Sequence, residues 1–462
     1  MKPFFTNDAI VFGILMLALA FVFNTSSSDK KGWQRFYTFF PPILLCYFIP
    51  ALLHWPLNLI AFDWFEPSIY DLAKDLGINL PTNASTAEIE KLFGQAGVEE
   101  SVYGEHKRGS RLYFVASRYL LPASLIWLCL SIDLKGIMRL GTKAIAMFLT
   151  ATVGIVIGGP IALIILTYLF PNLVGFTTDE LWRGLSTIAG SWIGGGANQT
   201  AMKEIFEVKG SVFASMVVVD IVVANIWMGF LLYGAKISDR IDARLKADNT
   251  AIKDLEKKVA DYQESIKKIP TANDLYTLLA VGFGGVALSH WGSQLITGWL
   301  APFAEPLKAA GLNSLLSSFF WLVVISTTLG LALSFTKYRQ LEGIGASRWG
   351  SIFIYILVAT IGMHMALGDI VNNLGLFAIG AIWMLVHVIL LLFVAWLIKA
   401  PFFFVAVGSQ ANVGGAASAP IVASAFSPAL APVGVLMAVL GYALGTYGAL
   451  ICAWLMQAAV GG

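Results

Sequence analysis

Charged residues are scarce in this chain. Of its 462 residues only 13% are Asp, Glu, Lys or Arg, while 57% are hydrophobic. Soluble globular domains carry about 25% charged residues, so this chain has too few charges to solvate the surface of a soluble protein of its size. The formal net charge is only +2, which gives no basis for nucleic acid as a partner. We therefore expect the lipid bilayer as the main partner.

Cysteine is scarce as well, and the three residues present lie in separate apolar stretches: Cys46, Cys129 and Cys452. This distribution predicts neither a disulfide framework nor a metal site, and we interpret these residues as small packing residues. His290, His364 and His387 also lie in apolar segments, without a metal-ligand spacing. We expect each of them to make an interhelical hydrogen bond. The sequence thus predicts no metal and no prosthetic group.

Long apolar segments are abundant. About 20 apolar residues in a helix cross the hydrocarbon core of a bilayer, and twelve segments approach that length. They lie at 8–23, 37–62, 111–133, 143–170, 184–206, 212–236, 272–299, 313–336, 350–370, 374–399, 402–427 and 430–457. The pattern predicts an all-α integral membrane protein in which about ten of these segments are transmembrane helices.

Two of the twelve segments differ from the rest because each has a polar, Gly-rich centre. The segment 184–206 contains GSWIGGGANQTA, and 402–427 contains GSQANVGGAASA. Consecutive glycines weaken a helix and expose its peptide groups. Lipid cannot hydrogen-bond such groups, so a break of this kind is tolerated only within protein or beside a water-filled cavity. We therefore predict two re-entrant hairpins.

The distribution of charge predicts how the chain is oriented. Residues 63–110 contain nine Asp and Glu against four Lys and Arg, whereas the loops at 24–36, 134–143 and 337–348 are basic. Basic loops remain in the cytoplasm. If both Gly-rich segments are re-entrant, every basic loop is cytoplasmic and 63–110 is outside. The first hairpin then enters from outside the cell and the second from inside.

The two halves of the chain also resemble each other. With one residue inserted in the second tip, Gly195–Gly196 aligns with Gly414–Gly415, Gly229 with Gly448, and Leu231 with Leu450. In the charge-derived topology the two units run in opposite directions, as in transporters with inverted repeats.

These observations divide the chain into six segments. They are N-terminal transmembrane helices at 1–62, an acidic extracytoplasmic insertion at 63–110, a first repeat at 111–236 with its hairpin at 184–206, an amphipathic cytoplasmic linker at 237–270, scaffold helices at 271–336, and a second repeat at 350–457 with its hairpin at 402–427.

Polar side chains at the two tips are candidates for substrate binding. At a broken tip, the free N–H groups at a helix N-terminus attract anions, and neighbouring polar side chains can complete a site. These candidates are Ser191, Asn198 and Gln199 on the first tip and Ser409, Gln410, Asn412 and Ser418 on the second. The alternative is that these side chains only cap the broken helices.

Asp220 is a candidate ion ligand, since a carboxylate at membrane depth is costly and usually faces a cavity or a partner. Thr200 and Asn225 could contribute oxygen ligands beside it, which would suit Na⁺; a proton on Asp220 is the alternative coupling ion. Asp133 and Asp369 lie at helix ends, where we expect them at the membrane interface.

The motifs GSWIGGGANQ at 190–199, SQANVGGAASAP at 409–420 and GYALGTYG at 441–448 resemble those of the YjcL-like membrane protein family, a domain of unknown function. The resemblance extends from about Tyr119 onward. In fold this family looks related to the clan of cation/proton antiporters and anion transporters, which includes sodium-coupled glutamate and 2-hydroxycarboxylate carriers. The resemblance implies an elevator-like carrier, often a homodimer. It supplies no substrate, and the insertion at 63–110 departs from a minimal carrier.

We expect a secondary active transporter in a bacterial cytoplasmic membrane, coupled to Na⁺, for a small anionic or zwitterionic solute such as an organic acid, amino acid or short peptide. A proton-coupled carrier is the alternative. An intramembrane enzyme or a channel is the alternative of another class. The chain has no HExxH and no GxSxG motif, and opposed tips fit a closed central site better than a continuous pore. We therefore expect no enzymatic activity.

The inverted topology predicts that Lys253 and Glu90 lie on opposite sides of the membrane. Cysteines introduced singly at these two positions should react with a membrane-impermeant maleimide from opposite sides of sealed vesicles. Labelling of both from the same side would contradict the arrangement.

Overall fold

The computed structural model describes residues 3–40, 42–81, 84, 86–131, 141–169, 175–247, 269–309, 313–363, 375–427 and 430–460. In these ranges the protein is mostly α-helical, which confirms the predicted all-α class. Contacts between residues divide it into an N-terminal unit, Met1–Arg118 with Tyr355–Leu367, and a core unit, Tyr119–Ile354 with Gly368–Gly462. Asp133, His364, Asp369, Lys253 and most of the amphipathic linker fall outside the described residues.

The first part of the N-terminal unit, Met1–Arg118, consists of three helices followed by a small lobe. The helices are α1 (Asp8–Ser26), α2 (Lys31–Phe39) and α3 (Pro42–His54). Asn7 caps α1, since its side-chain oxygen accepts from the Ala9 amide at 2.9 Å, which satisfies a free N–H of the first turn. α1 packs against α3.

The lobe is built on a two-stranded antiparallel ribbon of β1 (Asp63–Phe65) and β2 (Lys107–Gly109). Between the strands run α4 (Ser68–Asp75), α5 (Thr86–Gln95), α6 (Glu100–Tyr103) and the 3₁₀ turn η1 (Gly104–His106). They enclose a core of their own, made of Phe65, Ile69, Ala73, Ala84, Ile89, Phe93 and Tyr103. The acidic segment 63–110 is therefore a folded lobe.

The chain reaches the core unit through α7 (Leu112–Val115) and the π-helical turn η2 (Ala116–Leu120). The core-unit helices before the linker are α8 (Leu121–Leu130), α10 (Thr142–Leu169), α11 (Thr178–Gly194), α12 (Gly196–Ile205), α13 (Gly210–Lys236) and α14 (Ser238–Leu245). After the linker come α16 (Ala272–Leu300), η3 (Ala301–Phe303), α17 (Ala304–Ala309), η4 (Asn313–Leu316), α18 (Ser318–Ser334) and η5 (Lys337–Ile344). Next comes α19 (Ala346–Gly362), whose residues from Tyr355 onward belong to the N-terminal unit. The last helices of the core unit are α20 (Gly375–Ile398), α21 (Phe402–Val413), α22 (Gly415–Ser424) and α23 (Ala431–Ala459).

Several helices have the length and composition of membrane spans. Five in the described ranges are long and apolar enough: Asp8–Ser26, Leu112–Leu130, Thr142–Leu169, Gly210–Lys236 and Gly375–Ile398. The number rises to seven if two bent helix pairs, at 318–344 and 436–459, each count as one span. These helices make the protein a multi-pass membrane protein, while the count of ten spans stays a prediction.

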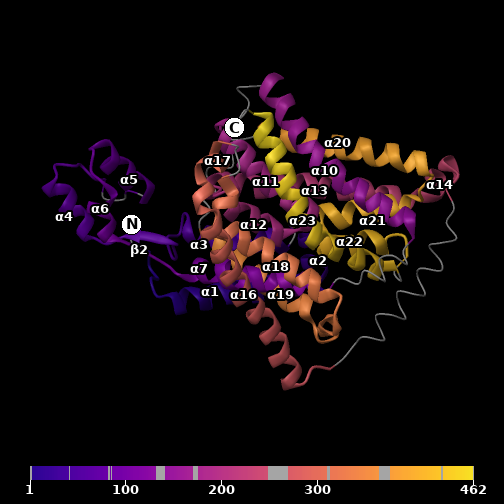
Figure 1. The fold of residues 1–462 in the computed structure, drawn as a ribbon, viewed down its shortest axis with the longest axis horizontal. Coiled ribbons are helices and arrows are strands. Elements are labelled where there is room, and N and C mark those ends of the chain that lie inside the picture. The colour runs from indigo at the N-terminus through magenta and orange to yellow at the C-terminus, as the bar shows by residue number, and fades with distance from the viewer. Residues whose placement is uncertain are drawn as a thin grey trace. The chain divides into compact units, whose positions relative to one another are not determined.

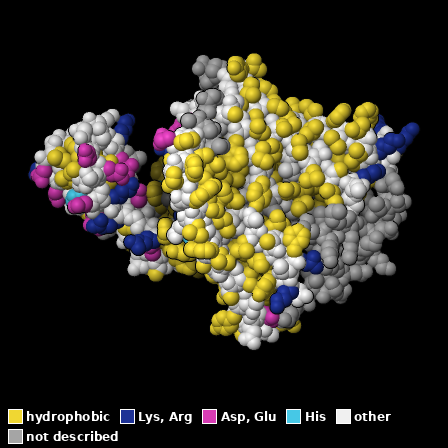
Figure 2. Space-filling model, in the orientation of Figure 1, with side chains coloured by type: hydrophobic (Ala, Val, Ile, Leu, Met, Phe, Trp, Pro, Cys, Tyr) yellow, Lys and Arg dark blue, Asp and Glu magenta, His cyan; other side chains and the backbone are white. Residues whose placement is uncertain are grey.

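The outer surface of the core unit agrees with this assignment. On α20 the side chains of Leu385, Ile389, Phe393 and Trp396 are each at least 55% exposed, and their spacing places them on one face of the helix. Figure 2 shows hydrophobic side chains over most of the visible face of the core unit, with Lys and Arg at its margins. An apolar surface of this extent is suited to lipid contact.

Two groups of four helices in the core unit have the same order. In each, a long helix is followed by two short helices and another long helix: α10 to α13 in the first group and α20 to α23 in the second (Figure 1). The groups interlock, because α10 packs against α20 and α21, while α11 packs against α23. Small residues permit close approach. For example, a methyl group on Gly158 of α10 would lie 2.6 Å from the Trp383 ring.

An ion cluster in the lobe generates a stability prediction. Lys107 Nζ lies 3.0 Å from Asp63 Oδ2 and 2.6 Å from Glu90 Oε1. Burial raises the pKa of Asp63, and the hydrogen bond from Lys107 acts in the opposite direction. In Lys107→Met the pKa of Asp63 should therefore rise further. A carboxyl group whose pKa is higher in the folded than in the unfolded protein lowers the free energy of unfolding as the pH rises through the folded-state pKa. Below the unfolded-state pKa it has no such effect.

We expect Lys107→Met to destabilise the lobe by about 1–3 kcal/mol at pH 7, because the largely buried Asp63 carboxylate loses its partner, and by much less at pH 4. Amide hydrogen exchange in α5 at the two pH values measures the effect. Lys74→Met, at an exposed position of α4, is the matched control. A loss of equal size at both pH values would contradict this account of Asp63.

Candidate functional site

The first Gly-rich segment forms two short helices with a break at Gly195. α11 ends at Gly194 and α12 begins at Gly196, and Gly195 between them has a φ of +76°, a conformation that glycine adopts without steric cost. The two helices pack against each other. A methyl group on Gly190 of α11 would lie only 2.6 Å from the Asn198 carbonyl oxygen on α12, so this close packing requires glycine.

The second segment has the same construction. α21 ends at Val413, α22 begins at Gly415 with a φ of +58°, and the two helices again pack together. Gly414 lies at the break, and a side chain there would occupy the space of the Gln410 amide and the Ser418 hydroxyl. Gln410 Nε2 donates to Ser418 Oγ at 2.6 Å, so this hydrogen bond crosses the break.

The two breaks lie next to each other. A methyl group on Gly415 would be 4.0 Å from the Cα of Gly195. Helix α23 contacts both elements at one glycine, because a methyl group on Gly441 would lie 2.7 Å from the Ile193 oxygen and 3.6 Å from the Ala411 oxygen. Segments more than 200 residues apart in sequence thus form one structural centre, which we call the tip junction.

Asn198 joins the first tip to α23. Its Nδ2 donates to the Gly194 oxygen at 3.1 Å and to the Tyr442 oxygen at 3.0 Å, and its Oδ1 accepts from Thr446 Oγ1 at 2.6 Å. The helix axis of α23 bends by 50° between its parts Leu436–Tyr442 and Leu444–Ala459. A side chain that bonds helix peptide groups is a recognised cause of such bends. Both the nitrogen and the oxygen of the Asn198 amide therefore have protein partners.

Asn412 joins the second tip to α10 in the same manner. Its Nδ2 donates to the Phe148 oxygen at 3.2 Å and to the Gly408 oxygen at 3.0 Å, and its Oδ1 accepts from Thr152 Oγ1 at 2.8 Å. Each tip asparagine thus bonds a threonine and the carbonyl group four residues before that threonine. The two asparagines lie on different helices and are held by different partners, so in this conformation both act as structural links.

Asp220 of α13 lies against the first tip. Its Oδ1 accepts from Trp192 Nε1 at 2.7 Å and its Oδ2 from Gln199 Nε2 at 2.9 Å, and the Ser191 side chain also hydrogen-bonds the carboxylate. Asp220 is only 6% exposed. Burial of an ionised carboxylate is tolerated where several donors face it. The three donors come from both sides of the break at Gly195, so Asp220 also ties α11 to α12.

Ser409 of α21 belongs to a second buried polar cluster. Its Oγ accepts from Trp227 Nε1 at 2.8 Å and lies 2.8 Å from His387 Nε2, while His387 Nδ1 lies 3.1 Å from the Ala151 oxygen. The carbonyl oxygen can only accept, so the proton is on Nδ1 and the Ser409 hydroxyl donates to Nε2. The interhelical role predicted for His387 is confirmed.

The other predicted site residues have more local partners. Thr200 Oγ1 donates to the Gly196 oxygen at 3.0 Å, and Asn225 Nδ2 donates to the Ile221 oxygen at 2.7 Å, each within its own helix. In the described part of the chain neither Thr200 nor Asn225 hydrogen-bonds Asp220, whose partners are Trp192, Gln199 and Ser191. The role of Thr200 and Asn225 as ion ligands stays a prediction, as do the substrate roles of the tip side chains.

Sequence reasoning missed several partners of the site. Trp192 and Trp227 contribute indole donors, and Thr152 and Thr446 fix the tip asparagines. Trp192 lies within the first Gly-rich motif and could have been noticed there. Thr446 lies within the motif GYALGTYG at 441–448 and could have been noticed as well. Thr152 and Trp227 lie in apolar helices, where a single Thr or Trp carries no positional signal.

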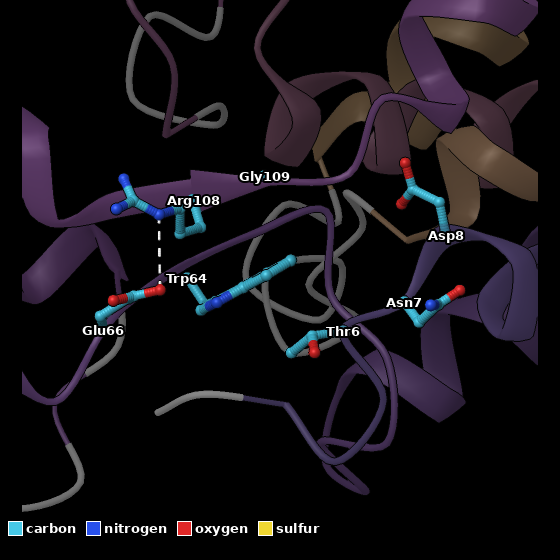
Figure 3. A pocket seen from close by; sticks show the side chains of 7 residues that line it. All are labelled: Thr6, Asn7, Asp8, Trp64, Glu66, Arg108 and Gly109. Carbon is cyan, nitrogen blue, oxygen red and sulfur yellow. Dashed lines mark ion pairs between the residues drawn. The ribbon is translucent and has the colours of Figure 1, made fainter.

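The N-terminal unit contains a separate open pocket with a volume of about 460 Å³. Thr6, Asn7, Asp8, Trp64, Glu66, Arg108 and Gly109 line it. Figure 3 shows the Trp64 ring between the Arg108–Glu66 ion pair and Thr6. Asn7 caps α1, and Asp8 Oδ2 accepts from the Arg111 amide at 3.0 Å. Much of its polar lining therefore already serves the local fold.

The asparagine links generate a prediction about stability. Thr152→Val removes the hydroxyl that donates to Asn412 Oδ1 and leaves that buried acceptor without its partner, which should cost about 1–3 kcal/mol. Thr150→Val, two residues earlier on α10, removes only a bond to the Ala146 oxygen of its own helix. In thermal unfolding of the purified protein, the midpoint should fall clearly more for Thr152→Val. Equal midpoints for the two variants would show that the link is not a stabilising contact.

Comparison with known proteins agrees with the membrane character. The family model for Protein of unknown function (DUF819) matches residues 103–459, a span that includes both tips. The chain is also 26% identical over 359 residues to a curated protein of Bacillus subtilis (strain 168), the uncharacterized membrane protein YjcL, and the match covers 73% of this chain and 82% of that protein. Because the family model matches well over half of the chain, the protein belongs to the DUF819 family.

Proposed function

We propose that this protein is a secondary active transporter of the elevator type, and not an enzyme or a channel. It takes a small anionic or zwitterionic solute such as an organic acid, amino acid or short peptide, coupled to Na⁺. The same proposal places it as a homodimer in a bacterial cytoplasmic membrane. The observation that carries the proposal is that the breaks in the two Gly-rich segments lie next to each other. A methyl group added to Gly415 would lie 4.0 Å from the Gly195 Cα.

The physical reason is the cost of breaking a helix in lipid. Unpaired peptide groups there are tolerated only within protein or beside water, and transporters use such discontinuous elements to bind solutes near the midplane of the membrane. α12 and α22 each start at the tip junction, at Gly196 and Gly415, so two helix N-termini lie there. Each offers N–H groups and the positive end of a helix dipole to an anionic group.

The repeated helix order supports the topological part of the proposal. The groups α10–α13 and α20–α23 have the same sequence of long and short helices, and their breaks fall at glycines that align in sequence. Two re-entrant hairpins of opposite orientation and two inverted repeats fit this order and the distribution of charged loops.

Asp220 supports the choice of coupling ion. An ionised carboxylate can accept about four hydrogen bonds or cation contacts, and the described donors are Trp192, Gln199 and Ser191. Capacity remains for a cation, and oxygen ligands suit Na⁺. A proton bound to Asp220 is the alternative, since it would also remove a costly buried charge.

Flux measurements test the carrier itself. The purified protein in proteoliposomes should take up labelled members of a panel of organic acids, amino acids and dipeptides when an inward Na⁺ gradient is imposed. The rate should saturate with solute concentration. A non-saturating ionic conductance would indicate a channel, and no uptake of any compound by correctly folded protein would overturn the proposal.

The coupling ion can be tested with Na⁺ as the only probe. If Na⁺ binds beside Asp220, NaCl should raise the unfolding midpoint relative to choline chloride at equal ionic strength. The gain is about 1.4 kcal/mol when Na⁺ is tenfold above its Kd. Asp220→Asn should abolish this difference. Under proton coupling, Asp220→Asn would instead remove a pH dependence. If neither dependence changes in Asp220→Asn, Asp220 is structural and the coupling proposal is wrong.

A further inference from the structure

Gln410 leaves one buried polar atom at the tip junction without a protein partner. Its side chain is on α21 and the residue is only 2% exposed. Nε2 donates to Ser418 Oγ at 2.6 Å, but Oε1 has no hydrogen-bond partner among the described residues. An unsatisfied buried acceptor costs about 1–3 kcal/mol and calls for an explanation.

The Gln410 amide lies beside the break. A side chain on Gly414 would collide with Gln410 Nε2, and the hydrogen-bond partner Ser418 belongs to the first turns of α22. Gly415, the next residue of the break, is the one that approaches Gly195 of the first tip. The free Oε1 thus belongs to a side chain beside the start of α22, and Gly415 at that start approaches Gly195, which precedes α12.

The tip junction is also the less enclosed part of the hairpins. Most residues of the two hairpins near the breaks are buried, whereas Gly195, Gly196, Gly414 and Ser418 keep partial exposure. By contrast, both the nitrogen and the oxygen of the Asn198 and Asn412 amides have protein partners. Among the tip amides of the described residues, Gln410 is therefore the one whose oxygen is fully buried without a hydrogen-bond partner.

We propose that the transported solute is a zwitterion with an amino and a carboxylate group, as in an α-amino acid. Gln410 Oε1 accepts a hydrogen bond from the ammonium group, and the N–H groups that begin α12 and α22 bind the carboxylate. This assignment rests on the proposed transporter function and narrows its solute class. Two features of the charge distribution favour it over a simple anion.

The first is that the described residues next to the two breaks, within 190–201 and 408–419, include no Lys or Arg. Lys203, the cation on α12, lies in the last turn of that helix and pairs with Glu204 at 3.0 Å, so it does not face the break. The second is Asp220, whose carboxylate bonds Trp192 and Gln199 on both sides of the first break. A negative charge there disfavours a dianion and favours a solute that carries its own positive group.

The orphan oxygen also predicts an unusual pattern in a variant. Gln410→Met replaces the unsatisfied amide by an apolar side chain of similar length, so the ligand-free protein should keep or raise its unfolding midpoint. At the same time it should lose the response to amino acids. A residue with a purely structural role would show the opposite, a loss of stability. Gln294→Met, at an exposed position of α16, is the matched control and should alter neither property.

The experiment compares three series of compounds, and within each series all compounds have the same side chain. L-alanine, L-aspartate and L-leucine are each paired with the corresponding 2-hydroxy acid and the corresponding acid without either group. Binding to the purified protein in saturating NaCl is followed by thermal shift and calorimetry. A site that hydrogen-bonds a donor group discriminates strongly against analogues that lack it. We expect at least one amino acid to bind at least about tenfold more tightly than both of its analogues, and Gln410→Met to remove that preference.

Three results overturn the assignment. If the hydroxy acids or the unsubstituted acids bind as tightly as the amino acids, the solute is an anion, and saturable uptake of those acids would leave the transporter function intact. If Gln410→Met binds amino acids with unchanged affinity, Gln410 is not the ammonium ligand. If no compound of the three series binds and the wider uptake panel is also inactive, the transporter function fails together with the assignment.

Discussion

Peptide groups at an interrupted helix cannot remain unpaired in lipid, and the core unit is organised around this constraint. Two interruptions, at Gly195 and Gly414–Gly415, leave free backbone groups at the ends of four short helices. The two breaks lie together, so one protein interior serves both. Asn198 and Asn412 then take up carbonyl groups of neighbouring long helices and of their own hairpins.

Helix α23 contacts both interrupted segments. Gly441 contacts backbone of both hairpins, and Tyr442 and Thr446 bond Asn198 just where the helix bends. Gly445 lies against Gly194 so closely that a methyl group on Gly445 would be 2.5 Å from the Gly194 Cα. A displacement of either hairpin must therefore move α23 or break these contacts.

The buried polar clusters around Asp220 and Ser409 differ in how completely their polar atoms are hydrogen-bonded. Asp220 retains acceptor capacity beyond its donors, whereas Ser409, His387 and Trp227 form a closed set in which each polar hydrogen has an acceptor. A closed set rigidifies its surroundings. The second Gly-rich segment is thus held through Ser409 and Asn412, while the first lies against a carboxylate that retains acceptor capacity. Together with the free oxygen of Gln410, this asymmetry concentrates the unsatisfied polar capacity at the tip junction.

The sequence alone determined the environment and class of this protein. The deficit of charge and the long apolar segments require a bilayer and helices, because only closed hydrogen-bonding patterns cross lipid. The two Gly-rich motifs also located both breaks, since consecutive glycines destabilise a helix wherever it folds. Tertiary structure decided the rest. That Thr152 serves Asn412, that Thr446 serves Asn198, and that Gln410 lacks a partner depend on packing between segments far apart in sequence. No local pattern encodes such pairings, because a lone polar residue in an apolar helix looks the same whether its partner is its own helix, another helix or a solute.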